Sequence, residues 1–148
     1  TRLIDDKKVP IYGSGQQVRD WVYVMDHCAG IDHALHYGTD GEAYNVGSEG
    51  ECTNIEITRR LLELLGKPDS LIKFIEDPRG GAHDKRYSVD ASKLRGLGWQ
   101  PSYEFTKVLE TTVQWYVENQ AWWRDIIRTD DYQAFTKRFY GSYLGSDL

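Results

Sequence analysis

Short runs of apolar and aromatic residues mark three segments of the chain as strands. WVYV at 21–24 is β-branched and aromatic, EAYNVG at 42–47 ends on a glycine, and LIKFIE at 71–76 is rich in isoleucine and phenylalanine. GSGQQV at 13–18 carries the glycines of a turn. The pattern therefore predicts short strands set between turns.

The clearest helix is predicted over 53–65. Thr53 and Glu56 have the T-x-x-E spacing of a capping box, in which two side chains satisfy the first backbone N–H groups of a helix. Gly66 and Pro68 follow the last leucine and predict the end of this helix.

Apolar residues at helical spacing predict three further helices. One is capped by Asp26 and runs to Gly38, a short one starts at Asp90, and a longer one begins near Phe105. The apolar stripe of the first helix is made by Ala29, Ile31, Ala34 and Leu35. The apolar face of the last helix is made by Val108, Leu109, Thr112, Val113 and Tyr116. The tail from Ala121 is aromatic but poorly periodic, and no element is predicted there.

Helices that alternate with short strands predict a mixed α/β fold, and 148 residues predict one domain over 1–148. The net charge of −5 does not provide the field that a nucleic acid would seek. No run approaches the roughly 18 apolar residues of a membrane helix. Cys28 and Cys52 suggest neither a disulfide scaffold nor a zinc cluster, so a cytoplasmic location is expected.

Arg19 is the first candidate for anion binding. It follows a glycine turn and precedes the predicted strand, where a guanidinium can be presented rigidly to a phosphate. The competing interpretation is an ion pair with Asp20 or with another surface carboxylate. Spacing alone favours the ion pair, so Arg19 needs further support.

The loop over 77–87 is a second candidate, because it concentrates positive charge in an acidic chain. Its glycines let backbone amides approach an anion, and its histidine adds a donor that titrates near neutral pH. Its cationic and titratable residues are Arg79, His83, Lys85 and Arg86. The alternative is a solvated surface loop.

Asn54 is a third candidate. It lies at the start of the predicted helix over 53–65, where free N–H groups and the helix dipole favour a negative ligand. Locally, a role in the cap explains Asn54 equally simply.

Several motifs, taken in order, resemble one enzyme family. VPIYGSGQQVRDWVYVMDH, GEAYNVG, an asparagine-led helix, LLGKP, HDKRYSVD and LGWQP are similar to dTDP-glucose 4,6-dehydratases, which are extended short-chain dehydrogenases/reductases. The resemblance runs from about Val9 to Trp123. Related nucleotide-sugar epimerases and decarboxylases share the strand but usually lack the combination of R-D-W with D-H.

The resemblance implies a division of labour in the whole enzyme. An N-terminal Rossmann domain would hold NAD and the catalytic residues, and a C-terminal region would bind the nucleotide sugar. This chain matches only the C-terminal region, because no G-x-G-x-x-G follows a strand. The resemblance therefore assigns no catalytic residue and no NAD site to this chain. The Rossmann domain of the family is expected to be absent from these residues.

The same resemblance assigns roles in substrate binding. Arg19 would bind the diphosphate, and Asn54 would make a further contact with the nucleotide sugar. The nucleotide pocket would be lined by Pro10, Ile11 and Tyr12, and the loop that closes over the substrate would contain Asp77, Arg79 and His83. The family usually reads D-R-P-G-H in this loop, whereas here arginine and proline are exchanged and two residues are added, so the role of Arg79 transfers less directly.

The expected function is the substrate-binding part of a dTDP-glucose 4,6-dehydratase, which forms dTDP-4-keto-6-deoxyglucose and water in deoxysugar biosynthesis. The chain alone is expected to be inactive. A fragment of a UDP-sugar epimerase or decarboxylase is one alternative, and a non-catalytic binding or assembly module is another. Apolar surface around 21–35 would then pack on a separate Rossmann domain or on a second copy of the chain.

Overall fold

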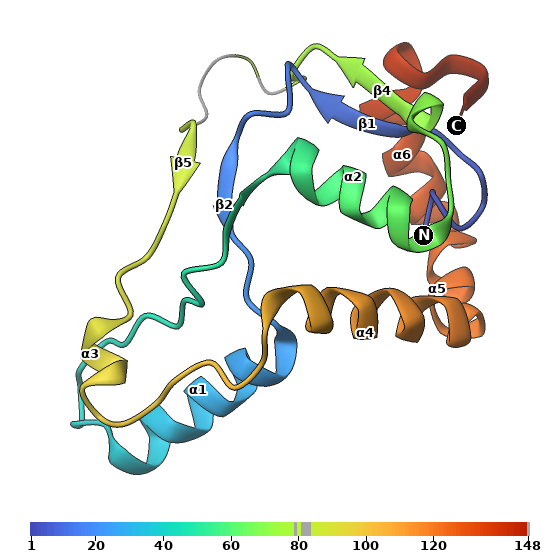
Figure 1. Cartoon of the computed structure of the whole chain (residues 1–148). Coiled ribbons are helices and arrows are strands. Elements are labelled where there is room, and N and C mark those ends of the chain that lie inside the picture. The colour runs from blue at the N-terminus through green and yellow to red at the C-terminus, as the bar shows by residue number, and fades with distance from the viewer. Residues whose placement is uncertain (79, 81–83, 148) are drawn as a thin grey trace. The chain divides into compact units, whose positions relative to one another are not determined.

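A computed structural model describes residues 1–78, 80 and 84–147. It confirms the predicted mixed α/β class (Figure 1). The strands are β1 (Val9–Tyr12), β2 (Val18–Asp20), β3 (Glu51–Thr53), β4 (Ile72–Ile75) and β5 (Arg86–Tyr87). The helices are α1 (Val24–Tyr37), α2 (Asn54–Leu65), α3 (Ser92–Arg95), α4 (Phe105–Glu118), α5 (Gln120–Ile127) and α6 (Asp130–Leu144), with short 3-10 turns at Asp69–Leu71 and Gly145–Asp147.

The chain forms two compact units, each built from separate stretches of sequence. The first unit comprises Thr1–Gln16, Asn54–His83 and Glu110–Leu148, and the second comprises Gln17–Thr53 and Asp84–Leu109. The candidate residues named above are therefore divided between the units.

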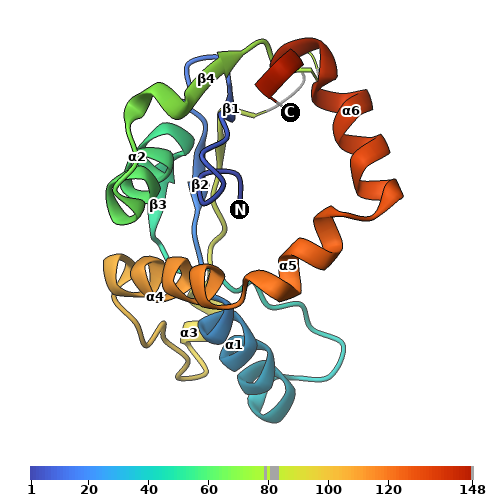
Figure 2. The same cartoon turned by 90° about the vertical axis from the view of Figure 1, so that its right-hand side faces the viewer.

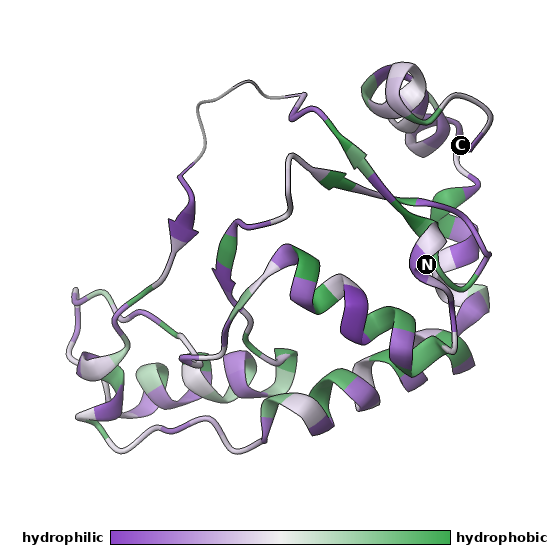
Figure 3. Ribbon diagram, turned by 45° about the horizontal axis from the view of Figure 1, so that its top comes forward, coloured by the Kyte–Doolittle hydropathy of each residue, from purple (hydrophilic) through white to green (hydrophobic). Residues whose placement is uncertain are grey.

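The sheet of the first unit is the parallel pair β1 and β4. Val9 lies opposite Ile72 and Tyr12 opposite Ile75, and the N–H of Gly13 extends the pairing to the carbonyl of Ile75 at 2.8 Å. Both strands are short and mainly apolar, as Figure 3 shows. Pro10 is tolerated in β1 because a two-stranded sheet consists only of edges.

Helix α2 supplies much of the core of the first unit. It occupies Asn54–Leu65, and Gly66 follows it with a φ of +64°, so the predicted helix and its end are confirmed. Ile55, Ile57 and Leu62 are buried, with Leu62 only 1% exposed. Burying a leucine of this kind stabilises the fold by about 1.5–3 kcal/mol.

One close backbone approach joins β1 to α2. A Cβ on Gly15 would lie 2.7 Å from the Cγ2 of Ile11 and 2.8 Å from the Cβ of Ile55, and the φ of Gly15 is +73°. The carbonyl of Gly15 accepts the N–H of Ile55 at 3.0 Å. The turn after β1 thus requires glycine both for its backbone conformation and for the space.

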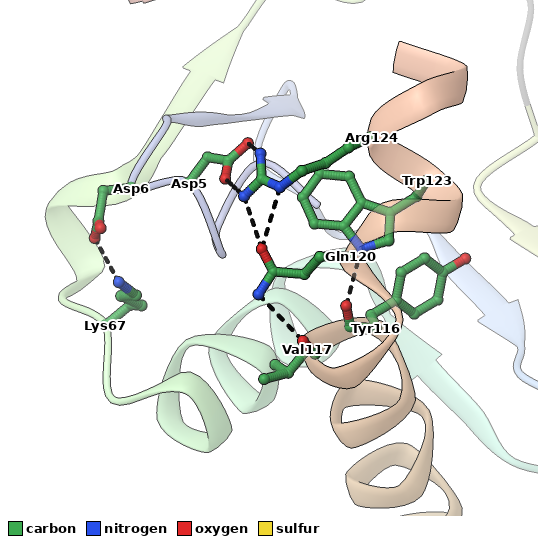
Figure 4. A network of polar contacts seen from close by, with 8 residues as sticks. All are labelled: Asp5, Asp6, Lys67, Tyr116, Val117, Gln120, Trp123 and Arg124. Atoms are coloured by element: carbon green, nitrogen blue, oxygen red, sulfur yellow. Dashed lines mark hydrogen bonds and ion pairs between the residues drawn. The ribbon is translucent and has the colours of Figure 1, made fainter. Parts of the chain in front are cut away.

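The tail after Ala121 forms two helices that its sequence did not predict. In Figure 2, α5 and α6 make up the orange-to-red end of the chain, with a bend between them. Arg124 binds both carboxylate oxygens of Asp5, at 2.6 and 3.2 Å, and also the amide oxygen of Gln120 (Figure 4). This network fastens α5 to the first residues of the chain, and a second ion pair joins Asp6 to Lys67 at 2.6 Å.

The sheet of the second unit has the order β3-β2-β5. Strand β2 is antiparallel to β3 and parallel to β5. The predicted strand at 21–24 is therefore wrong, because the sheet uses 18–20 instead and Val24 already begins α1. Residues 42–47 form no strand either, and β5 was missed because it is only two residues long and lies among polar neighbours.

Helix α1 exists, but its start and its buried face differ from the prediction. Asp26 does not cap the helix; it lies in the first turn, is 3% exposed and accepts the N–H of Ser102 at 2.8 Å. Ile31 and Leu35 were expected to be buried, yet they are 54% and 79% exposed. The buried side is instead the one with Gly30, where a Cβ would meet Val46 at 2.8 Å.

The remaining core of the second unit is a cluster of Ala91, Leu94 and Trp99. Cys28 is exposed, Cys52 is half-buried, and both are free thiols. In the part of the chain that the structure describes, no helix is long and apolar enough to cross a membrane.

Candidate functional site

Arg19 lies in the middle of β2, in the second unit. Its Nη1 donates to the carbonyl of Val18 at 2.6 Å and to that of Lys85 at 3.4 Å, and its Nη2 donates to the carbonyl of Asp84 at 3.5 Å. Its Cζ lies 4.3 Å from the centre of the Tyr87 ring. Carbonyls and an aromatic face therefore hold the guanidinium without neutralising its charge.

The expected ion pair between Arg19 and Asp20 does not form. The carboxylate of Asp20 accepts the N–H and the hydroxyl of Ser48, at 3.0 and 2.7 Å, and the N–H of Gly50 at 3.1 Å. Asp20 thus orders the turn before β3. Among the described residues, no carboxylate pairs with Arg19, which leaves its positive charge available to an anion.

A second arginine is neutralised on the opposite side of the same sheet. Arg86 of β5 binds Glu51 of β3 through both carboxylate oxygens, at 2.9 and 2.5 Å. Hydrogen bonds from Arg86, and then from Ser88, lower the pKa of Glu51 to about 2. The cationic loop residue Arg86 therefore serves the sheet rather than an anion.

The segment expected to line the nucleotide pocket forms β1 of the first unit. The side chain of Ile11 is 6% exposed and packs against Gly15 and Ile55. Pro10 lines a cavity of about 430 Å³ within this unit. The hydroxyl of Tyr12 lies 2.9 Å from that of Tyr140 in α6, so the two phenols form a hydrogen bond.

Asn54 is the first residue of α2 and is half-buried. Its carbonyl accepts the hydroxyl of Thr58 at 2.8 Å, and the N–H of Ile55, next in the helix, is bound to Gly15. Asn54 therefore lies at a helix N-terminus, as its sequence position predicted, in a turn that is fixed from both sides.

The candidate loop after β4 is only partly described. Asp77 begins a turn in which its carbonyl accepts the N–H of Gly80 at 3.1 Å, and the φ of Gly80 is +70°. Arg79 and His83 lie outside the described residues. Asp77 and Asn54 belong to the first unit and Arg19 to the second, so their convergence on one ligand stays a prediction.

Tyr87 is the neighbour of Arg19 that sequence reasoning missed. It was placed in the loop after 76, although it pairs with Arg19 in the parallel register of β2 and β5. The signal available in the sequence was a short polar-aromatic alternation at RY, which is too brief to predict a strand.

Tyr103 and Lys107 have the spacing of a Y-x-x-x-K pair, in which a lysine can activate a tyrosine for proton transfer. Tyr103 precedes α4, which starts at Phe105, and its ring packs edge-on against Tyr23 at 5.3 Å. Tyr103 thus lies outside the helix that contains Lys107.

Two common cofactor motifs, the Rossmann glycine turn and a cluster of metal ligands, are not found among the described residues. The Rossmann motif places a glycine-rich turn between a strand and a helix, whereas the glycine turn after β1 leads into strand β2. Within the described ranges, no three histidine, cysteine, aspartate or glutamate residues group together as metal ligands. What this part of the chain provides is the positively charged guanidinium of Arg19, held in place on a short sheet.

The Arg19 guanidinium on a short sheet suits the binding of a phosphorylated ligand. Comparison with known proteins defines the family to which the chain belongs. The model of the GDP-mannose 4,6-dehydratase family matches residues 2–112, and the chain therefore belongs to this family. The predicted membership of the nucleotide-sugar dehydratases is thus confirmed.

Individual relatives point to one branch of the family. A dTDP-glucose 4,6-dehydratase from Actinoplanes is 48% identical over 124 residues, which cover 83% of this chain and 38% of that protein. The crystal structure of dTDP-glucose 4,6-dehydratase from Bacillus anthracis in complex with NAD has a TM-score of 0.77 at 42% identity, and covers 84% of this chain and 39% of its own.

An epimerase of the same fold is less similar. UDP-glucuronic acid 4-epimerase from Bacillus cereus, in complex with UDP-glucuronic acid and NAD, has a TM-score of 0.70 at 25% identity, and covers 79% of this chain and 37% of its own. The chain spans about two fifths of the length of the relatives that it matches. It corresponds to the C-terminal part of the dTDP-glucose dehydratase structures.

Proposed function

We propose that this chain is the substrate-binding part of a dTDP-glucose 4,6-dehydratase. In the whole enzyme, dTDP-glucose would be converted to dTDP-4-keto-6-deoxyglucose and water. The observation that carries this proposal is the Arg19 guanidinium, held on β2 without a carboxylate partner among the described residues, in a chain 48% identical to such a dehydratase.

The roles proposed for individual residues follow from their chemistry. Arg19 binds the diphosphate by charge-assisted hydrogen bonds. Asn54 contributes from the start of α2, and Pro10, Ile11 and Tyr12 supply the nucleotide pocket. Ile11 would contribute through its backbone, because its side chain is buried in the core. Asp77, Arg79 and His83 form the loop beside the substrate.

These residues bind and orient a substrate but do not transfer a proton or a hydride. NAD, which supplies the hydride chemistry, would be held by a Rossmann domain and not by this chain. The chain by itself is therefore proposed to be inactive.

A binding experiment tests this proposal. The chain is titrated calorimetrically with dTDP, UDP and thymidine. We expect dTDP to bind more tightly than thymidine, and Arg19→Gln to weaken dTDP binding about tenfold to a hundredfold, because charged hydrogen bonds contribute about 1.5–3 kcal/mol. Arg59→Gln removes the same charge from an exposed arginine of α2 and should leave binding unchanged.

The outcomes separate the alternatives. Preference for UDP over dTDP would assign the chain to the UDP-sugar epimerases, whose structural relative shares the fold at 25% identity. Failure of all three ligands to bind would favour a non-catalytic assembly module. Conversion of dTDP-glucose by the chain with added NAD would contradict the proposal that it is inactive alone.

A further inference from the structure

The two faces of β2 carry different interactions. Because side chains alternate along a strand, Arg19 shares one face with its register partners Cys52 and Tyr87. Glu51 and Arg86 lie on the other face, on the strands to either side of β2. Their bidentate ion pair therefore spans the central strand and ties β5 to β3.

This arrangement determines the orientation of the Arg19 side chain. The Tyr87 ring covers one face of the guanidinium at 4.3 Å, and the carbonyls of Val18, Asp84 and Lys85 occupy its Nη atoms. The carbonyls of Asp84 and Lys85 belong to the residues that lead directly into β5, so the position of β5 sets both kinds of contact.

The edge of the guanidinium formed by Nε and Nη2 is the part to which a ligand can hydrogen-bond. Among the described residues, no acceptor binds the Nε of Arg19, and Nη2 donates to one carbonyl only. An oxyanion that accepts one hydrogen bond from Nε and one from Nη2 would be bound side-on in a bidentate manner. The ring and carbonyls would fix that edge before the ligand arrives, which lowers the entropic cost of binding.

We propose that Tyr87 is a positioning residue for a nucleoside diphosphate, acting through the Arg19 guanidinium, and that the Glu51–Arg86 pair holds β5 in the register that this requires. This inference rests on the proposed function, because it takes the diphosphate of the nucleotide sugar as the ligand of Arg19. It adds residues that bind no part of the substrate themselves.

The expected effect follows from the strength of a cation–π contact. Such contacts contribute about 0.5–2 kcal/mol, so their loss should weaken binding between about twofold and thirtyfold. The ring is what matters here, and therefore phenylalanine should replace Tyr87 with little loss while leucine should not.

The test is a double-mutant cycle on the 148-residue chain, with dTDP and thymidine as calorimetric probes. Tyr87→Leu should weaken dTDP binding twofold to thirtyfold and leave thymidine binding unchanged, whereas Tyr87→Phe should retain the affinity for dTDP. In an Arg19→Gln background, Tyr87→Leu should have no further effect. Circular dichroism checks that each variant folds, which is expected because Tyr87 is 46% exposed.

The result also separates this inference from the proposed function. Suppose that Arg19→Gln weakens dTDP binding. If Tyr87→Leu and Tyr87→Phe then have the same effect, or if the effects of Arg19→Gln and Tyr87→Leu are additive, the positioning role is wrong and the proposed function stands. If Arg19→Gln has no effect, both fail. Glu51→Gln provides an independent variant on the opposite face: it should weaken dTDP binding only when Arg19 is present, and an equal loss in the Arg19→Gln background would overturn the role of the ion pair.

Discussion

At the scale of single residues, the positions that matter most are set by neighbours far away in sequence. Arg19 was found from its place between a glycine turn and a strand, but its contact with Tyr87 depends on the pairing of β2 with β5. Local sequence favoured a pair with Asp20, whose carboxylate is instead taken by Ser48 and Gly50. Nearest-neighbour reasoning cannot foresee such competition.

Gly15 provides a test at this scale. Gly15→Ala should destabilise the chain by about 1–3 kcal/mol more than Gly66→Ala, because only at Gly15 would the new Cβ overlap Ile11 and Ile55. Gly66 is the matched control: its φ is also positive, but the space around it is open, so alanine there costs only the backbone term of roughly 1–2 kcal/mol. Urea unfolding measures both, and equal losses would contradict the close approach.

At the scale of elements, the sequence predicted those with strong local signals. Helix α2 carries the T-x-x-E spacing of a capping box at its start and a glycine after its end, and α4 has an apolar face in which Val108 is buried, so both were predicted correctly. Strand β4 lies within the predicted 71–76. Strands β1, β2, β3 and β5 were missed, because each is only two to four residues long and pairs with segments that lie far away in sequence. Helices α5 and α6 were missed, because their aromatic and charged residues follow no clear period and tertiary contacts such as Asp5–Arg124 decide their structure.

The ion pair across β2 predicts how the stability of the second unit depends on pH. The folded-state pKa of Glu51 is about 2, below the ordinary glutamate pKa of 4.5, so the folded chain binds fewer protons in this range. The contribution of the pair should therefore be constant above about pH 5 and decline as the pH falls toward 2.

Glu51→Gln isolates this contribution. The difference in thermal unfolding midpoint between wild type and Glu51→Gln should be steady from about pH 5 to pH 8 and shrink progressively below about pH 4.5. Because the pair is partly exposed, high salt should reduce the difference as well. A difference that grows on acidification would show that Glu51 is not stabilised as a carboxylate.

At the scale of the whole molecule, helix α1 presents an apolar face to solvent. Val24, Cys28, Ile31 and Leu35 recur at helical spacing, and all four are exposed. This is the surface that we propose to pack on a Rossmann domain or on a second copy of the chain. Exposed apolar patches of this kind are typical of protein–protein interaction sites.

Charged substitutions on this face test self-association. If copies of the chain associate through α1, the double variant Ile31→Glu/Leu35→Glu should lower the average mass at high concentration to that of the monomer, because burying two carboxylates is unfavourable. Asp32→Ala/His36→Ala alters exposed polar residues of the same helix and should not change the mass. Sedimentation equilibrium measures both, and a wild-type monomer at every concentration would leave only the separate Rossmann domain as partner.

The interleaved composition of the two units has a consequence for biosynthesis. All of the second unit lies within residues 17–109, whereas the first unit also needs residues 110–148. All residues of the β3-β2-β5 sheet have therefore been synthesised before Arg124, the ion-pair partner of Asp5, is added to the nascent chain. The order of translation thus favours folding of the second unit first. The first unit can be completed only after α5 and α6 have been synthesised.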